Sequence, residues 1–225
     1  MSSLFRIDCS SQEAIEAARI AKERITEFEE ELTVKYDLRL SFESLQLDAD
    51  PAQAAQTDVY QLEVSLLERD LKVIIRSRLR RNYIAGTGKL LEWLLADLDG
   101  EAPMTAGITN FTAQCSMRIH YMPGHFGNSF EVCWSSEMKR YLEDLALAGA
   151  SGYGDWFDPN DMPDPYHSHV YHSSSMFLWN RKTEWLAYSQ QLGLDNIIVV
   201  TPNVGFVDQM RPEWVGVRNH KLRVQ

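Results

Sequence analysis

The densest group of residues that could do chemistry is the stretch DWFDPNDMPDPYHSHVYH, which begins at Asp155. It holds four aspartates and half of the six histidines in the chain. Imidazole nitrogens and carboxylate oxygens are ligands that divalent metals prefer, and residues two apart on an extended chain point to the same side. As one of two interpretations, the stretch predicts a divalent-metal site at His167, His169 and His172, completed by Asp164 or His120.

The spacing of these histidines resembles a known signature. HxHxxH matches the histidine positions of the HxHxDH motif of metallo-β-lactamase-like hydrolases, with Tyr171 in the place of the motif's aspartate. His220 is the only histidine that follows to complete the second half of such a site. The resemblance implies a metal-dependent hydrolase, which is our alternative function, but it does not place the chain in that family.

The second interpretation of the same stretch is a recognition loop. Aspartate and proline are typical of turns, and the aromatic side chains among them are the wrong composition for disorder. Long loops in compact domains usually carry function, and aromatic residues are common anchors in protein interfaces. We therefore favour an irregular loop at about 150–176 that binds a protein partner through Trp156, Phe157, Tyr166 and Tyr171.

A third group of useful residues is the basic segment 69–81. Arg76, Arg78 and Arg80 stand at even spacing, so a strand here would present a row of guanidinium groups to phosphates or nucleic acid. Opposite charges that face each other across a sheet are common, however, and we favour such internal pairing over an anion site. The candidate acidic partners are Glu43, Glu63 and Glu68.

Other catalytic motifs are incomplete. The segment AGTGK at 85–89 is not a Walker phosphate loop, because Tyr83 and Leu90 stand where that motif requires glycine and a hydroxyl residue. It predicts a glycine turn that enters a helix. The three cysteines lack CxxC spacing, and no serine stands in a GxSxG elbow. The motifs therefore favour binding over catalysis.

The elements that must position these residues follow from apolar periodicity. A capping-box pattern at Ser10–Glu13 and an apolar stripe to Leu32 predict a long N-terminal helix. Period-two alternation predicts strands at 38–47, 60–66, 71–79, 106–121 and 130–134, and an apolar run predicts another at 196–201. Further helices are predicted at 89–98, 136–148 and 181–192.

Strands in this pattern follow one another and do not alternate strictly with helices, which favours the α+β class. We expect a single α+β domain over residues 1–225. Its sheet would be mainly antiparallel, with the long N-terminal helix and two or three further helices packed on it.

Composition limits the function. Against 32 acidic residues stand 22 basic ones, and the net charge of −10 argues against a chain that coats nucleic acid. No apolar run is long enough to span a bilayer, and the N-terminus lacks the apolar core of a signal peptide, so we expect a cytoplasmic protein with no membrane contact. The favoured function is a binding or assembly protein that acts through protein–protein contacts as a component or modulator of a larger complex.

Overall fold

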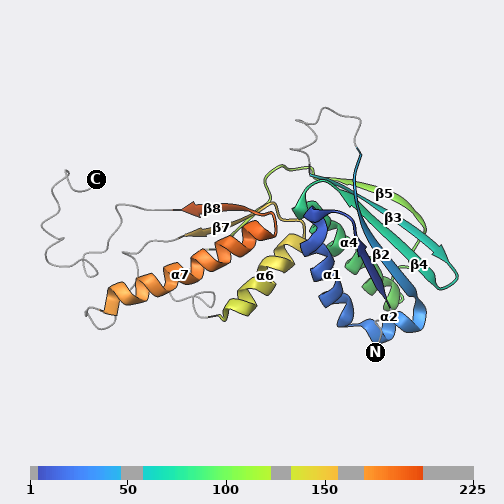
Figure 1. Cartoon of the computed structure of the whole chain (residues 1–225), viewed down its shortest axis with the longest axis horizontal. Helices are drawn as coiled ribbons and strands as arrows, with labels where there is room; N and C mark the ends of the chain where they lie inside the picture. The colour runs from blue at the N-terminus through green and yellow to red at the C-terminus, as the bar shows by residue number, and fades with distance from the viewer. Residues whose placement is uncertain (1–4, 47–57, 123–132, 157–169, 200–225) are drawn as a thin grey trace, which may run out of the picture. The chain divides into compact units, whose positions relative to one another are not determined.

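The computed structural model describes residues 5–46, 58–122, 133–156 and 170–199 (Figure 1). Contacts between residues group the chain into two compact units. Unit 1 comprises Met1–Arg118, Leu142–Ser151 and Gln191–Leu194, and unit 2 comprises Ile119–Tyr141, Gly152–Gln190 and Asp195–Gln225. The prediction of one domain did not anticipate this division, in which short segments from late in the chain complete unit 1.

A five-stranded sheet forms the centre of unit 1, in the order β1-β2-β4-β3-β5. The strands are β1 (Arg6–Cys9), β2 (Asp37–Ser44), β3 (Val59–Leu67), β4 (Asp70–Ser77) and β5 (Gly107–Thr112). β3 runs antiparallel to β4 and β5, whereas β1, β2 and β4 run parallel. The α+β class is thus confirmed, but the sheet is mixed and not mainly antiparallel, because helices cross over between β1 and β2.

Alternate side chains of this sheet form the core of unit 1. Leu38, Leu40 and Phe42 of β2 are buried, as are Leu62 and Val64 of β3, while their sequence neighbours are less buried. The alternation predicted for these strands is confirmed. Helices α1 (Ile15–Thr26) and α4 (Arg80–Leu98) pack on one another and cover the apolar face (Figure 1).

The N-terminal helical segment is broken, and the prediction of one long helix is wrong. A 3-10 turn, η1 (Gln12–Ala14), precedes α1, and a separate helix, α2 (Glu29–Lys35), follows it. The break lies at Phe28, whose φ of −131° and ψ of 24° are not helical. Just before it, the Thr26 hydroxyl donates to the Lys22 carbonyl at 2.8 Å, a back-bond that tends to bend helices.

The predicted capping box is also wrong. Neither Ser11, which precedes η1, nor Ala14, which precedes α1, makes a side-chain cap hydrogen bond. The Ser10 hydroxyl donates instead to the carbonyl of Phe42 on β2 at 2.8 Å. The apolar stripe nevertheless faces the core, because Ala14, Ile25 and Leu32 are fully buried. The stripe, not the cap, fixes where this segment packs.

Helix α4 begins at Arg80, well before the start predicted at residue 89, so the two glycines of AGTGK lie inside a helix. Each marks a close approach. A Cβ atom at Gly86 would lie 2.8 Å from Ile75 Cγ2, and one at Gly88 would lie 2.1 Å from the carbonyl oxygen of Leu147. The glycines therefore serve packing and do not form a turn.

The strand predicted at 106–121 is two strands in different units. β5 ends at Thr112, residues 113–118 are not in a strand, and β6 (Ile119–Met122) belongs to unit 2. Of the partner strand predicted at 130–134, residues 133 and 134 are not in a strand, and the rest lie outside the described residues. Continuous apolar alternation across 113–118 concealed the change of unit.

Unit 2 contains a parallel sheet in the order β6-β7-β8, with β7 (Gly152–Trp156) and β8 (Asp195–Val199). Helix α6 (Ser135–Leu147) joins β6 to β7, and α7 (Val170–Gln191) joins β7 to β8. The predictions of α6 and β8 are confirmed, whereas α7 begins earlier than residue 181. The predicted loop at 150–176 is wrong at both ends, because β7 and the first turns of α7 lie there, and residues 157–169 lie outside the described part.

Helices α6 and α7 lie on one face of this sheet (Figure 1). On that face Lys182 of α7 bonds Asp155 of β7 at 3.2 Å, with each side chain 3% exposed. The opposite face carries Tyr121, Ile197 and Val199, which are 45%, 37% and 38% exposed. Parallel sheets are usually covered on both faces, but among the described residues no helix lies on this second face.

Asp97, near the C-terminal end of α4 in unit 1, is a buried carboxylate. Asp97 is 3% exposed and accepts hydrogen bonds from the Tyr36 hydroxyl at 2.7 Å and the Met104 N–H at 2.9 Å, and it lies 2.9 Å from the Lys35 ammonium. Burial by itself would raise the pKa of Asp97, but the bonds from Lys35, Tyr36 and Met104 outweigh it and lower the pKa. Burial and the same carboxylate raise the pKa of Tyr36 to about 12.

Replacing Asp97 by asparagine should therefore reduce the free energy of unfolding at pH 7 by about 1–3 kcal/mol. Because folding lowers the pKa of Asp97, its contribution is present above the ordinary aspartate pKa and is lost as the pH falls through the lowered value. Urea denaturation of wild type and Asp97→Asn should show a difference that shrinks in acid. Asp99→Asn, an exposed neighbour, is the control; a difference for Asp97→Asn that does not change with pH would contradict the assignment.

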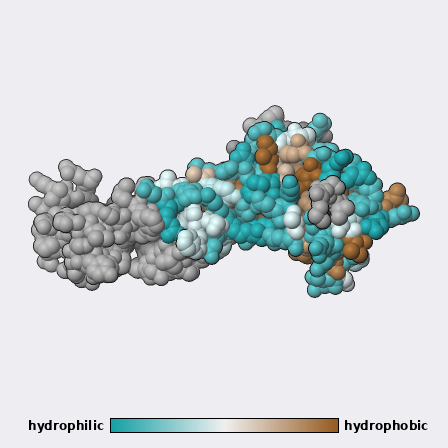
Figure 2. Space-filling view, turned by 60° about the horizontal axis from the view of Figure 1, so that its bottom comes forward, coloured by the Kyte–Doolittle hydropathy of each residue, from teal (hydrophilic) through white to brown (hydrophobic). Residues whose placement is uncertain are grey.

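On the face drawn in Figure 2, hydrophobic residues form separate small groups among hydrophilic ones. None of the described helices is both long and apolar enough to cross a membrane.

Candidate functional site

Of the five predicted metal ligands, only His120 and His172 lie in the part of the chain that the structure describes. His167, His169 and Asp164 lie outside that part, and His172 lies in the first turn of α7. The His120 ring packs edge-on against Tyr141, with centroids 5.8 Å apart. Within the ranges that the structure describes, no three histidine, cysteine or carboxylate side chains form a metal-binding group.

The predicted aromatic anchors are only partly described. Trp156 is the last residue of β7, and Tyr171 is the second residue of α7. Phe157 and Tyr166 lie outside the described residues. Binding of a protein partner by these four residues stays a prediction.

The three predicted anion-binding arginines do not form a row. β4 ends at Ser77, so Arg78 follows the strand and Arg80 begins α4. Arg76 bonds Glu43 at 2.9 Å and Glu63 at 2.6 Å, as the internal-pairing alternative predicts. Burial lowers the pKa of Arg76, but these two carboxylates outweigh that effect and raise it.

Arg80 is likewise engaged within unit 1. Its guanidinium lies 3.1 Å from Glu13 and donates to the Gln191 carbonyl at 3.0 Å. Arg78 is exposed. Even spacing failed to predict a common face because the chain changes from strand to helix within the segment.

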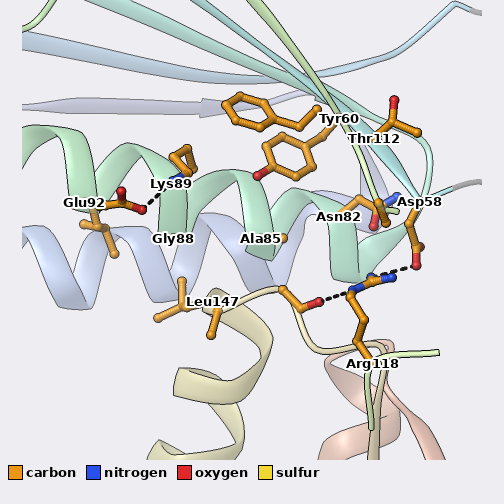
Figure 3. A pocket seen from close by; sticks show the side chains of 15 residues that line it. Asp58, Tyr60, Asn82, Ala85, Gly88, Lys89, Glu92, Thr112, Arg118 and Leu147 are labelled. Carbon is orange, nitrogen blue, oxygen red and sulfur yellow. Dashed lines mark hydrogen bonds and ion pairs between the residues drawn. The ribbon is translucent and has the colours of Figure 1, made fainter. Parts of the chain in front are cut away.

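A pocket of about 500 Å³ opens in unit 1 beside α4. It is formed where the start of β3, helix α4, the chain from the end of β5 to Arg118 and the turn after α6 meet (Figure 3). Its volume is within the range of roughly 300–1,000 Å³ that is typical of small-molecule sites. Asp58 and Arg118 lie at one end, Lys89 and Glu92 lie at the other, and Tyr60 lies between them (Figure 3).

The Asp58 end of the pocket is a closed ion-pair cluster. Asp58 is 8% exposed, and its two carboxylate oxygens bond Arg81 at 2.7 Å and Arg118 at 2.8 Å. The amide of Asn82, oriented so that both of its ends are satisfied, donates to the same carboxylate at 3.1 Å. A carboxylate with this many partners has little capacity left for a ligand.

Arg118 holds the wall of the pocket in place. Its Nε donates to the Gly149 carbonyl at 2.7 Å, one Nη donates to the Cys115 carbonyl, and the other bonds Asp58. The Arg118 backbone N–H donates to the Ser151 hydroxyl at 2.8 Å. All three guanidinium nitrogens are thus engaged, and the residue acts as a positioning group for the turn after α6.

The middle of the pocket is aromatic. Tyr60 and Phe111 are register partners on β3 and β5, and their rings stack with centroids 4.7 Å apart and planes 15° apart. Trp93 of α4 lies 6.0 Å from the Phe111 centroid. Gly86 lets α4 approach Tyr60 closely, because a Cβ there would lie 3.3 Å from that ring. The Tyr60 ring is therefore fixed by its neighbours.

The Lys89 end of the pocket keeps unused hydrogen-bonding capacity. Lys89 bonds Glu92 at 2.6 Å across one turn of α4, with side-chain exposures of 28% and 64%. Among the described residues, the Tyr60 hydroxyl has no hydrogen-bond partner. Burial, and then the charge of Glu92, raise the pKa of Tyr60, so this hydroxyl stays protonated at neutral pH and can donate.

Sequence reasoning missed this pocket. Its residues come from four segments that are distant in the sequence, and none of them forms a motif with fixed spacing. Two features of the sequence could have indicated the pocket, but both are weak. The pairing of Tyr60 with Phe111 can be recognised only when the register of β3 and β5 is known, and Gly88 was interpreted as part of a turn and not as a point of close packing. The arrangement can bind a small molecule that has both an apolar face and polar groups.

Comparisons with known proteins add a likeness of fold. No family model matches the chain, and no curated protein matches it. Among solved structures, an N-acetyl-β-hexosaminidase from Streptomyces plicatus in complex with Thio-NAglucal matches with a TM-score of 0.51 at 13% identity. The match covers 90% of this chain and 42% of that one, so the chain spans less than half the length of the hexosaminidase. At this identity the likeness concerns the fold alone.

Proposed function

We propose that this chain is a binding protein and that the pocket of unit 1 takes a carbohydrate. The observation that carries the proposal is the composition of the pocket, in which a fixed aromatic pair lies between two ion pairs. Sugars present C–H faces that pack on apolar and aromatic surface, and hydroxyl groups that both donate and accept hydrogen bonds. The pocket offers both kinds of surface.

Two further facts support a carbohydrate as the first ligand class to test. One solved structure with a similar fold is an N-acetyl-β-hexosaminidase. Both pocket carboxylates, Asp58 and Glu92, are held in ion pairs, which favours binding over acid–base catalysis at this site.

The proposal is tested by adding N-acetylglucosamine and its disaccharide to the full chain and following the thermal melt. A ligand that binds only the folded state raises Tm as its concentration rises. We expect a saturable rise for at least one sugar, and the same sugars should leave a variant with a filled pocket, Ala85→Trp, unchanged. A Tm that does not respond to any sugar would contradict the proposal.

A second candidate function is the protein–protein contact predicted from the sequence. The observation in its favour is the face of the unit 2 sheet opposite Lys182, which no described helix covers and where Tyr121, Ile197 and Val199 are exposed. Exposed apolar surface on a parallel sheet is typical of an interaction site. If this face mediates assembly, sedimentation should show association that Ile197→Lys abolishes; association that survives this change would exclude the face.

Three other sequence-based hypotheses stay predictions. They are metal-dependent hydrolysis at the histidine cluster, phosphate or nucleic-acid binding by segment 69–81, and a cytoplasmic location. Metal content of untagged protein tests the first, because a tightly held ion copurifies in near-stoichiometric amount.

A further inference from the structure

The two ends of the unit 1 pocket differ in what they can offer to a ligand. At the Asp58 end, both carboxylate oxygens and all three guanidinium nitrogens of Arg118 are already bonded to protein groups. At the other end, the Lys89 ammonium uses one of its three donors and Glu92 uses one oxygen. New hydrogen bonds to a ligand can therefore form at the Lys89 end without breaking existing ones.

The charges that line the pocket are balanced. The charged lining residues are Asp58 and Glu92, which are negative, and Lys89 and Arg118, which are positive. Arg81 adds a positive charge behind Asp58, but it is not part of the lining. At the open end an anion that binds Lys89 would also face the negative charge of Glu92, and a cation that binds Glu92 would also face the positive charge of Lys89, so the gain from either contact is offset by repulsion.

A neutral ligand avoids that conflict. We propose that the ligand is an uncharged sugar, held by hydrogen bonds to Lys89, Glu92 and the Tyr60 hydroxyl. This inference rests on the proposed carbohydrate-binding function and adds the ligand's charge and the residues that select it. Lys89 donates to a sugar oxygen, Glu92 accepts from a sugar hydroxyl, and the Tyr60 hydroxyl, which points into the pocket from β3, can do either (Figure 3).

The ligand's charge is tested with three compounds that differ at one group. N-acetylglucosamine is neutral, glucosamine carries an ammonium, and N-acetylglucosamine 6-phosphate carries a phosphate. Calorimetric titration of the full chain should give the tightest binding for the neutral sugar, by about tenfold or more over each charged relative. That binding should change little with salt, because no net charge is neutralised.

The selecting residues are tested by unbalancing the ion pair. Glu92→Gln removes the negative member of the pair and should weaken the binding of N-acetylglucosamine about tenfold. The affinity for N-acetylglucosamine 6-phosphate, relative to that for N-acetylglucosamine, should rise at least tenfold. Lys89→Met should shift preference toward glucosamine in the same way. Lys72→Met, an exposed lysine of β4 that does not line the pocket, is the matched control and should change nothing.

The outcomes separate this inference from the proposed function. If none of the three compounds binds, the carbohydrate-binding function itself is wrong. If sugars bind but a charged relative binds as tightly as the neutral one, or if Glu92→Gln leaves the order of affinities unchanged, the function stands and the neutral-ligand inference is overturned. Circular dichroism of each variant shows that a loss of binding is not a loss of fold.

Discussion

Replacing Lys182 by methionine is expected to lower the free energy of unfolding by about 3–5 kcal/mol, the largest effect of a single change that we predict. Lys182 of α7 and Asp155 of β7 form an ion pair of 3.2 Å in unit 2, and each side chain is only 3% exposed. Removing the ammonium leaves the Asp155 carboxylate buried without this counter-charge. Desolvation of a charge is costly in such a position, whereas the apolar stem of methionine fills similar space.

The control for this variant lies in the same unit. Lys139 and Glu184 form an ion pair of 2.6 Å, but their side chains are 39% and 47% exposed. Lys139→Met should cost no more than about 1 kcal/mol, because water screens exposed pairs. Urea denaturation of both variants measures the difference, and equal losses would show that burial does not decide the energetics of the Lys182 pair.

The second large effect is expected at Gly88. In an ordinary helix interior, replacing glycine by alanine stabilises by up to about 1 kcal/mol. At Gly88 the added Cβ would lie 2.1 Å from the Leu147 carbonyl oxygen, which is backbone and is held by the contacts of the following turn. Gly88→Ala should therefore destabilise unit 1 by about 1–3 kcal/mol, since the helix and the turn must separate.

The sign of this change decides the interpretation. A loss of stability together with a loss of sugar binding would show that the close approach of α4 to the turn shapes the pocket. A gain in Tm for Gly88→Ala would show that Gly88 is an ordinary helical residue and that the wall of the pocket is elsewhere. Gly88 and Leu147 both belong to unit 1, so the comparison concerns that unit alone.

Elements with strong local periodicity could be predicted from the sequence. The alternation in β2 and β3 and the pattern of α6 need only near neighbours, and the structure confirms them. The mixed sheet could not be predicted in this way, because parallel pairing of β2 with β4 depends on contacts between distant segments. The break at Phe28 could not be predicted, because the apolar stripe continues across it.

The candidate site was harder to predict than the fold. Conspicuous residue types drew attention to the histidine cluster and to the arginines, whereas the pocket uses common residues from four segments. Lys89 and Glu92 are an ordinary helical pair until β3 brings the Tyr60 hydroxyl beside them. The function of such residues depends on where packing places them, and one sequence does not contain that information in a local form.

The most direct test of the account is a titration of the full chain with N-acetylglucosamine, followed by backbone amide NMR. We expect saturable shifts confined to the pocket segments, namely 58–60, 82–92, 111–118 and 147–149. The shifts should follow one dissociation constant that agrees with calorimetry. An absence of saturable shifts in these segments, or shifts confined to other parts of the chain, would contradict the carbohydrate-binding pocket.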